Sequence, residues 1–237
     1  MLILGIDVET TGLDRLEHGI TEIGAILWDT EFQTPVKFVN VLVDPEQEIP
    51  EEIIRLTGIT PELISKHAVS GFDALQSLHA LHLKADFILA HNAPFDKGFI
   101  SQLYAEHGVV MPEKIWIDSS VDVPYPELIQ TRKLTHLAAE HKFVNPFAHR
   151  AVTDVLTMLQ VCSHYSWDEL IESAKQPNIT IRAMVTFNDK EKAKSTGYRW
   201  DGENKVWLKN IKANRRDEEI QRAQKLGFEV SDWRQSG

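Results

Sequence analysis

The sequence predicts an α/β protein in which a mixed sheet is flanked by helices and followed by a second, small α+β domain. Two observations predict this class. Apolar, strand-like runs open the chain and then alternate with helix-like segments as far as about residue 165. Gln176-Pro177-Asn178 then interrupts the pattern, and a basic segment with its own strand and helix signals follows. We therefore expect one domain over residues 1–175 and another over residues 178–237.

The first three elements read as strands. Residues 2–9 form a β-rich run that ends at Thr10-Thr11-Gly12. Residues 20–28 and 36–43 are further strand-like runs, which Asp29-Thr30 and Asp44-Pro45 interrupt.

Helices and short strands alternate after this point. Helical character begins near Pro50, and the apolar spacing favours further helices over four segments, residues 70–83, 94–107, 134–141 and 151–165. Two short apolar runs between them, residues 87–90 and 115–117, are typical of buried strands. Because strands come first and then alternate with helices, a mixed sheet covered by helices fits the order.

The C-terminal segment has its own pattern. Residues 179–187 are strand-like and residues 189–195 helix-like, and a charged helix over 214–225 and a short segment over 228–230 end the chain. Residues 197–208 favour a hairpin closed at Asp201-Gly202, since Asp-Gly suits tight turns.

Composition limits the setting. Cys162 is the only cysteine, so a disulfide within the chain is excluded and a reducing compartment is expected. No run approaches the roughly 18 apolar residues of a membrane span, and the apolar start covers only six residues without a basic leader or cleavage site. We therefore expect a cytoplasmic protein that has no membrane partner.

Charge divides the chain in the same place as the pattern. Residues 1–177 hold 12 basic and 26 acidic residues, whereas residues 178–237 hold 13 basic and 9 acidic ones. The basic surplus suggests that the C-terminal segment touches an anionic partner, although a mild surplus is also typical of a solvated face.

Acidic residues recur where strands end or helices begin. Asp7 and Glu9 are two apart on a strand and share one face, while Val8 points to the other. Asp96 and Asp154 each stand near a predicted helix start, where an acid alone is ordinary. Such ends converge on one rim of an α/β sheet, and four carboxylates there suit two hard divalent cations, Mg²⁺ or Mn²⁺.

A histidine accompanies the last of these acids. His149 lies five residues before Asp154 in the stretch HRAVTD. On one regular helix the two side chains would point about 140° apart, so they meet one object only if the chain bends between them. We therefore expect His149 outside the helix, with a side chain more mobile than that of Asp154.

Three stretches resemble a known family in order and spacing. IDVETTG (6–12), HNAPFDKGF (91–99) and HRAVTD (149–154) are similar to the three motifs of the DnaQ-like, DEDDh-type 3′→5′ exonucleases, typified by the proofreading epsilon subunit of bacterial DNA polymerase III. The resemblance covers roughly residues 1–165. It implies a ribonuclease-H-like fold and metal-dependent release of nucleoside 5′-monophosphates from a free 3′ end, with single-stranded DNA as the expected substrate.

The resemblance also implies roles for particular residues. Asp7, Glu9, Asp96 and Asp154 correspond to the metal ligands, and His149 to the general base, a role that an imidazole suits near pH 7. Gly12, without a side chain, would permit close approach of the terminal nucleotide, whereas Phe95 next to a buried strand is also typical of a core. The substrate contacts that the resemblance implies are Thr10, Thr11, Gly12, His91, Asn92 and Phe95.

Three alternatives remain at this point. An exonuclease directed at RNA would have the same motifs, because the 2′-hydroxyl alone separates the substrates. A proofreading subunit would use the C-terminal segment to bind a polymerase or another DNA-processing protein. A catalytically silent nucleic-acid-binding module is a third, although it would be expected to lack one of the acids, and none is missing.

The C-terminal stretch KAKSTGYRWDGENKVWLKN (192–210) lies outside the resemblance just described. It weakly resembles a small domain of unknown function that is appended to plasmid primases. Interleaved aromatic and basic residues suit single-stranded nucleic acid through stacking and phosphate attraction, but two tryptophans across a hairpin also suit a small core. The candidate contacts are Lys194, Arg199, Trp200, Lys205 and Trp207.

Overall fold

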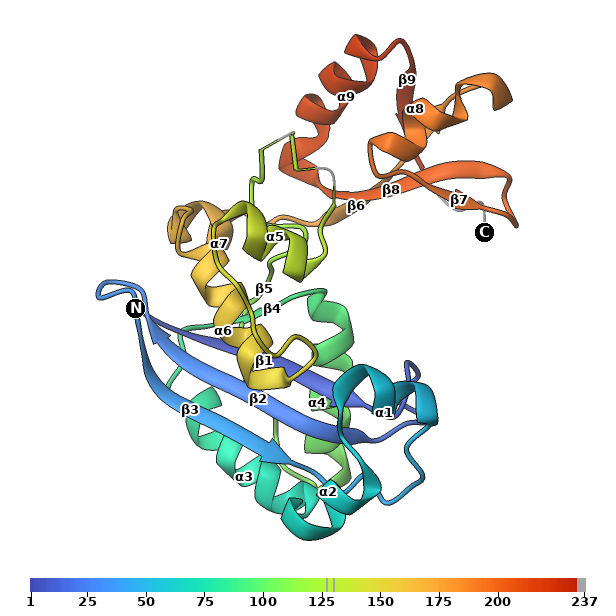
Figure 1. Ribbon diagram of the computed structural model, residues 1–237. Helices are drawn as coiled ribbons and strands as arrows, with labels where there is room; N and C mark the ends of the chain where they lie inside the picture. The colour runs from blue at the N-terminus through green and yellow to red at the C-terminus, as the bar shows by residue number, and fades with distance from the viewer. Residues whose placement is uncertain (127, 130, 234–237) are drawn as a thin grey trace.

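The computed structural model describes residues 1–126, 128–129 and 131–233, and within them it contains two β-sheets with separate hydrophobic cores (Figure 1). The last four residues of the expected 178–237 segment therefore lie outside the described residues. The strands are β1 Leu2–Thr10, β2 Ile20–Asp29, β3 Thr34–Leu42, β4 Phe87–Ala90, β5 Trp116–Asp118, β6 Asn178–Met184, β7 Arg199–Asp201, β8 Val206–Lys212 and β9 Glu229–Asp232.

The first sheet is mixed, as the sequence predicts. Its order is β3-β2-β1-β4-β5, with antiparallel pairing among β1, β2 and β3 and parallel pairing of β1 with β4 and of β4 with β5. The long β1 is thus the central strand, and the helical connections place β4 beside it and β5 beside β4, all in parallel.

Helices cover both faces of this sheet (Figure 1). Leu4, Ile6 and Val8 of β1 face a core shared with α3 and α4, whereas Ile3 faces a core shared with α5, α6 and α7. In the described part of the chain, no helix is long and apolar enough to cross a membrane. The helices are α1 Glu51–Thr57, α2 Pro61–His67, α3 Gly71–His82, α4 Ala93–Glu106, α5 Leu134–Glu140, α6 Ala151–Cys162 and α7 Trp167–Lys175.

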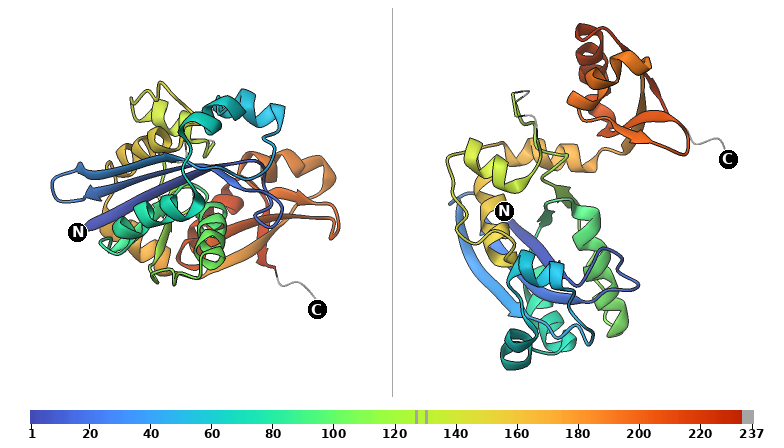
Figure 2. Two further views of the ribbon diagram at one scale, coloured as in Figure 1. Left: turned by 90° about the horizontal axis from the view of Figure 1, so that it is seen from below. Right: turned by 45° about the vertical axis from the view of Figure 1, so that its right-hand side comes forward.

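The second sheet has the order β7-β8-β6-β9, and its pairs are antiparallel. Two 3₁₀ turns, η1 Phe187–Asp189 and η2 Ala213–Arg215, precede the helices α8 Lys190–Ser195 and α9 Arg216–Lys225. The sheet and its helices stand to one side of the first sheet and connect to it through α7 (Figure 2). That the two sheets belong to independent domains stays a prediction.

Several expected elements differ in extent. The helix expected over 151–165 ends at Cys162, and a separate helix that the sequence reading missed, α7, follows it. A capping signal marks its start, because the Ser166 side chain accepts a hydrogen bond from the backbone N–H of Glu169. The strand expected over 179–187 ends at Met184, and η1 begins at Phe187, the last residue of the expected range.

The predicted hairpin exists, but its turn is not the predicted one. β7 and β8 pair from Arg199↔Leu208 to Asp201↔Val206. The left-handed residue of the loop is Lys205, with a φ of 53°, rather than Gly202. The Asp201 carboxylate accepts hydrogen bonds from the backbone N–H groups of Glu203 and Asn204, so a longer loop capped by this side chain replaces a tight Asp-Gly turn.

A buried polar contact joins the two sheets. Asp122, which follows β5 and is 1% exposed, places its Oδ1 3.3 Å from the ammonium of Lys212 on β8 and 3.0 Å from the Ser173 hydroxyl, which donates to it. Arg215 donates to the Asp122 carbonyl at 2.8 Å. Since Lys212 is itself 6% exposed, the charges of this pair compensate each other away from water.

Candidate metal centre

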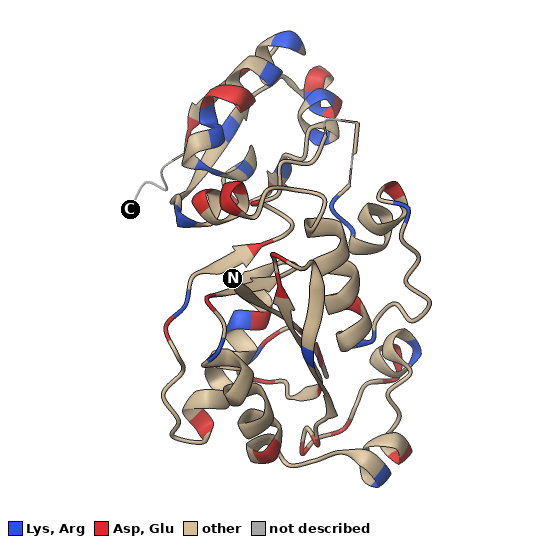
Figure 3. Cartoon of the chain, turned by 90° about the vertical axis from the view of Figure 1, so that its left-hand side faces the viewer, with Lys and Arg blue, Asp and Glu red and all other residues tan. Residues whose placement is uncertain are grey.

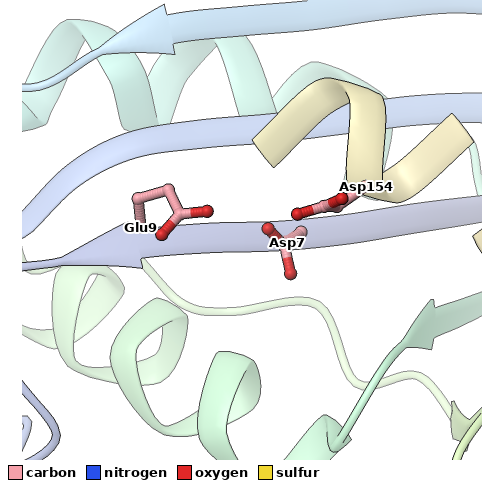
Figure 4. A group of neighbouring side chains, drawn as sticks. All are labelled: Asp7, Glu9 and Asp154. Atoms are coloured by element: carbon pink, nitrogen blue, oxygen red, sulfur yellow. The ribbon is translucent and has the colours of Figure 1, made fainter. Parts of the chain in front are cut away.

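Two carboxylates project from one face of β1. Because side chains alternate along a strand, Asp7 and Glu9 point away from the core that receives Ile6 and Val8. Asp154, in the first turn of α6, lies over the same face of β1 (Figure 4). Each of the three residues offers one carboxylate oxygen, and these oxygens lie within 4.8 Å of one another. We call this set the acidic cluster.

Glycines let α6 lie close to the strands. Gly24 of β2 pairs with Asp7, and a Cβ built on Gly24 would lie 2.3 Å from the backbone carbonyl carbon of Ala151 and the nitrogen of Val152. A Cβ on Gly5 would lie 2.7 Å from Val155 Cγ1. Any side chain at Gly24 would therefore push the start of α6 outward, and the close approach is what brings Asp154 to Asp7.

A buried ion pair fixes the start of α6. Glu22 of β2, which pairs in register with Glu9, is fully buried, and Arg150 Nη2 donates to its Oε1 at 2.7 Å. The backbone N–H of Ala151 donates to Glu22 Oε2 at 2.9 Å. The sequence reading missed both Glu22 and Arg150. An acid inside the apolar run ITEIGA was the available signal, since a buried carboxylate needs a partner.

The chain bends between His149 and Asp154, as predicted. α6 begins at Ala151, and His149 precedes it in the left-handed region with a φ of 64°. The backbone N–H of His149 donates to Asp154 Oδ2 at 3.0 Å, and Asn145 Nδ2 donates to Oδ1 at 2.6 Å. Asn145 was also missed, because its role arises from a loop. The exposed His149 side chain adjoins Asp154, while its mobility stays a prediction.

The expected fourth ligand has a hydrogen-bond partner of its own. Asp96, in the first turn of α4, is 2% exposed, and its Oδ1 accepts a hydrogen bond from the backbone N–H of Val8 at 3.1 Å. In the described ranges the acidic cluster contains three acids and not the four expected. The Val8 amide engages one of the two oxygens of the Asp96 carboxylate. Asp96 still lies close enough for its charge to raise the pKa of Asp7, and its role as a ligand stays a proposal.

The residues after β1 form a closed turn. Thr10 and Thr11 are 7% and 1% exposed, and the Thr10 hydroxyl donates to the Gly12 carbonyl at 2.6 Å. A Cβ on Gly12 would lie 2.3 Å from the His18 imidazole. The missing side chain at Gly12 therefore leaves room for the His18 imidazole, and close approach of a terminal nucleotide to this glycine stays a prediction. Backbone contacts of Thr10, Thr11 and Gly12 with substrate stay a prediction.

The residues around the start of α4 have partners of their own. Both ring nitrogens of His91 are engaged, Nδ1 with the Ser119 hydroxyl at 2.8 Å and Nε2 with the Arg132 carbonyl at 2.7 Å, so neither is free for a substrate. Phe95 lies against Phe99, with ring centroids 5.0 Å apart, and packs against the core. Asn92 takes the left-handed N-cap position with no side-chain cap, and its exposed side chain leaves its predicted substrate contact open.

The five C-terminal candidates divide into two groups. Lys194, Trp200, Lys205 and Trp207 line one groove of the second sheet, whereas Arg199 is exposed but does not line it. Trp207 packs against the small core, and Trp200 is 53% exposed. The small-core interpretation therefore fits Trp207 and not Trp200.

Electrostatics favour a cation in the acidic cluster. Burial, and then the charges of Asp96 and its neighbours, raise the pKa of Asp7 well above its usual value. Burial, and then Asp154 and Glu22, raise the pKa of Glu9 from 4.5 to about 8. Burial also raises the pKa of Asp154. Oxygen ligands that repel one another in the absence of a cation suit a hard divalent ion such as Mg²⁺ or Mn²⁺.

The raised pKa values predict how a cation and pH affect stability. Between about pH 4.5 and 8 the folded, metal-free protein holds more protons at Glu9 than the unfolded chain, so its stability falls as the pH rises through this range. Mg²⁺ that binds only the folded state should raise Tm, and more so at pH 8 than at pH 5.5, where protons compete. Thermal unfolding in EDTA and in Mg²⁺ at both pH values measures this. Glu9→Gln should flatten the metal-free pH dependence, and a Tm indifferent to Mg²⁺ at both pH values would contradict a cation site.

Comparisons with known proteins agree on the first sheet and its helices. A family model described as "Exonuclease" matches residues 4–162. The PolC-type DNA polymerase III of Listeria monocytogenes is 28% identical over 172 residues, which make up 72% of this chain but 11% of that protein. The DNA polymerase III subunit epsilon of Rickettsia conorii is 34% identical over 97 residues, which cover 40% of this chain and 41% of that protein. The chain thus spans only a small part of the polymerases that it matches.

Solved structures show the same fold. The zinc-bound complex of E. coli exonuclease I with single-stranded DNA superposes with a TM-score of 0.61 at 15% identity, over 79% of this chain and 48% of that one. The nuclease domain of 3′hExo, described as a DEDDh family member bound to rAMP, has a TM-score of 0.56 at 17% identity, over 69% of this chain and 90% of that one. At these identities the likeness establishes the arrangement of strands and helices.

Proposed function

The chain belongs to the exonuclease family whose model matches residues 4–162, and from that premise we propose that it hydrolyses the 3′-terminal phosphodiester bond of single-stranded DNA and releases nucleoside 5′-monophosphates. The observation that carries the proposal is the acidic cluster, in which Asp7 and Glu9 on β1 and Asp154 on α6 bring carboxylate oxygens within 4.8 Å. Nucleases with this fold support the choice of substrate. One of them is exonuclease I, whose structure was solved in complex with single-stranded DNA.

The residues have separable roles in this proposal. Asp7, Glu9 and Asp154, together with Asp96, would hold two divalent cations. When bound, such cations favour the deprotonation of water and stabilise the charge on the attacking and leaving oxygens. Asn145 and the His149 amide orient the Asp154 carboxylate through their hydrogen bonds. Glu22 and Arg150 hold the start of α6, which sets the position of Asp154 relative to β1.

His149 is assigned the proton transfer. Its imidazole takes the proton of the attacking water as the water oxygen bonds to phosphorus and the bond from phosphorus to the leaving 3′-oxygen breaks. The left-handed backbone at His149 turns the residue out of α6, so that the ring is not fixed on the helix beside Asp154. An exposed ring on a loop can approach the substrate after it binds.

Replacing His149 with glutamine tests this role. We expect kcat to fall by about 10²- to 10⁴-fold, the usual contribution of a general base, with little change in KM. The dependence of kcat on pH should also differ from that of the native chain, because a general base is one of the groups that set this dependence. His164→Gln is the matched control, because this histidine follows the C-terminal end of α6, whereas Asp154 lies in the first turn of that helix. An unchanged pH profile in the His149 variant would remove the general-base assignment.

The reaction itself is tested with labelled oligonucleotides. Single-stranded DNA labelled at its 5′ end should shorten one nucleotide at a time in Mg²⁺, and the same strand labelled at its 3′ end should lose its label in the first step. EDTA should stop both. Internal cuts, digestion from the 5′ end, or no digestion by the metal-replete protein would each reject the proposal. A parallel RNA strand that is digested faster would favour the RNA-directed alternative.

A proofreading role is the second candidate, because the relatives at 28% and 34% identity are named as DNA polymerase III proteins. In that role the substrate would be a mismatched primer end, and a polymerase would deliver it. Mixing the purified chain with a replicative DNA polymerase and measuring co-elution tests the association. Separate elution, together with free nuclease activity, would favour an independent enzyme.

A further inference from the structure

The second sheet contains a groove that the acidic cluster does not explain. It has a volume of about 850 Å³ and lies between the end of β6 with the β7–β8 hairpin on one side and η1 with α8 on the other. Ala183 of β6 pairs in register with Trp207, so the end of β6 and the hairpin form one continuous floor. The groove lies in the part of the molecule that stands to one side of the first sheet (Figure 2).

Aromatic rings line this groove at its surface. Trp200 is 53% exposed and lies across the hairpin from Trp207, with ring centroids 5.6 Å apart and planes at 56°. Phe187 on the opposite wall is 80% exposed, and the Lys190 ammonium lies over its ring, 4.0 Å from the centroid. The small core needs Trp207, which packs against it, but it leaves Trp200 and Phe187 outside. Exposed rings on both walls of one groove favour a ligand with flat apolar surfaces.

The groove also gathers basic residues without acidic partners. Arg182, Lys190, Lys194 and Lys205 line it, with Glu191 as the one acid in the lining. Among the described residues, none of these four forms an ion pair, although other basic residues of the second sheet do. Figure 3 shows Lys and Arg recurring over the elements of this sheet and its helices. The groove is therefore a place where positive charge remains available to a ligand.

We propose that this groove binds a few nucleotides of single-stranded nucleic acid, separately from the acidic cluster. A base stacks on the exposed Trp200 ring, phosphates pair with Lys194 and Lys205, and Lys190 adds positive charge beside the Phe187 ring. A duplex would hide the base faces that the rings need, so the single strand fits and the double helix does not. An acidic peptide would use the cations but leave the exposed rings without a role. The inference extends the proposed function with a second contact and does not depend on the nuclease chemistry.

Trp200 is the residue to test first. The full chain is titrated against a fluorescein-labelled oligothymidylate in EDTA, with anisotropy as the readout, so that hydrolysis cannot interfere. Because stacking of one base contributes about 1–3 kcal/mol, Trp200→Ala should weaken binding at least about fivefold. Trp200→Phe should retain most of the affinity. Phe32→Ala is the matched control, since Phe32 is 73% exposed in the loop between β2 and β3.

The charges give an independent readout. Lys190, Lys194 and Lys205 changed together to glutamine should lower the salt slope of log Kd by about 2, because single-stranded contacts contribute about 0.7 each. A variant with Lys37, Lys66 and Lys84 changed to glutamine has the same change in net charge on the first 175 residues and should keep the slope. Equal loss in both variants, or an unchanged affinity in Trp200→Ala, would overturn the inference.

The outcomes separate this inference from the proposed function. If the Trp200 and lysine variants weaken binding as expected but the chain fails to digest DNA, the nuclease proposal is rejected and the assignment of the groove to nucleic acid is retained. If the chain digests DNA but Trp200→Ala does not change binding, the nuclease proposal is retained and the assignment of the groove is rejected. If a polyglutamate peptide displaced the oligothymidylate and bound more tightly, the groove would be assigned to an acidic protein partner, and the nucleic-acid inference would be rejected.

Discussion

Replacing Asp7 with asparagine is expected to lower kcat in saturating Mg²⁺ by on the order of 10³-fold or more, as removal of one member of a catalytic unit commonly does. Asp7 is the most central of the acids, since the charges of Asp96, Glu9, Asp154 and Glu22 all raise its pKa. An amide at this position supplies no negative charge to hold a cation. Digestion of a 3′-labelled strand measures the effect.

The same variant should be at least as stable as the native chain in EDTA. Asp7 is buried among like charges, so asparagine relieves repulsion that the metal-free protein would otherwise carry. If Tm rises while activity is lost, the loss of activity comes from the missing carboxylate and not from misfolding. Asp168→Asn, at an exposed position in the first turn of α7, is the control and should keep full activity. Digestion at the native rate by Asp7→Asn would show that the acidic cluster is not the centre of the reaction.

Replacing Gly24 with alanine is expected to have the next largest effect, although the residue carries no reactive group. The added Cβ would meet the backbone of Ala151 and Val152 at 2.3 Å, and backbone cannot rotate away as a side chain can. α6 must therefore move, and Asp154 moves with it. A displacement of about 1 Å at a catalytic group costs roughly 10²-fold in rate. We expect kcat to fall by about that factor.

Stability should fall with activity in this case, by about 1–3 kcal/mol, the usual cost of overpacking. Urea unfolding measures it. Gly202→Ala is the control, because a Cβ there would meet its nearest neighbour, Trp200 Nε1, at an ordinary 3.8 Å and the backbone does not require glycine. Native activity in Gly24→Ala would mean that the position of α6 does not limit the reaction.

The fold could be predicted from the sequence where local pattern decides it. The β-rich run of β1 and the apolar runs of β2, β4 and β5 placed the strands within one or two residues. α7 was not predicted as a separate helix because its pattern closely follows that of α6, and the Ser166–Glu169 cap is the local signal that marks its start. The hairpin loop differed because the Asp201 side chain, rather than Gly202, shapes it.

Less of the candidate site than of the fold could be predicted from the sequence. Asp7 and Glu9 followed from a strand's period, and the position of His149 outside α6 followed from helix geometry. The pair of Glu22 and Arg150 joins residues 128 apart, so it depends on the register of β2 beside β1 and on where α6 begins. The turning of Asp96 toward the Val8 amide is likewise a product of tertiary packing. No local sequence pattern predicts the Glu22–Arg150 pair or the hydrogen bond of Asp96.

The buried contact of Asp122 with Lys212 and Arg215 restrains the two sheets relative to each other at one point. If the groove on the second sheet and the acidic cluster both bind the strand, a flexible tether would let them adjust to any substrate length, whereas this contact limits the range of their separation. A strand too short to reach from one to the other can occupy only one of them at a time. Affinity plotted against oligonucleotide length should therefore rise in a step rather than gradually, because only a strand long enough to reach both sites gains the second contact.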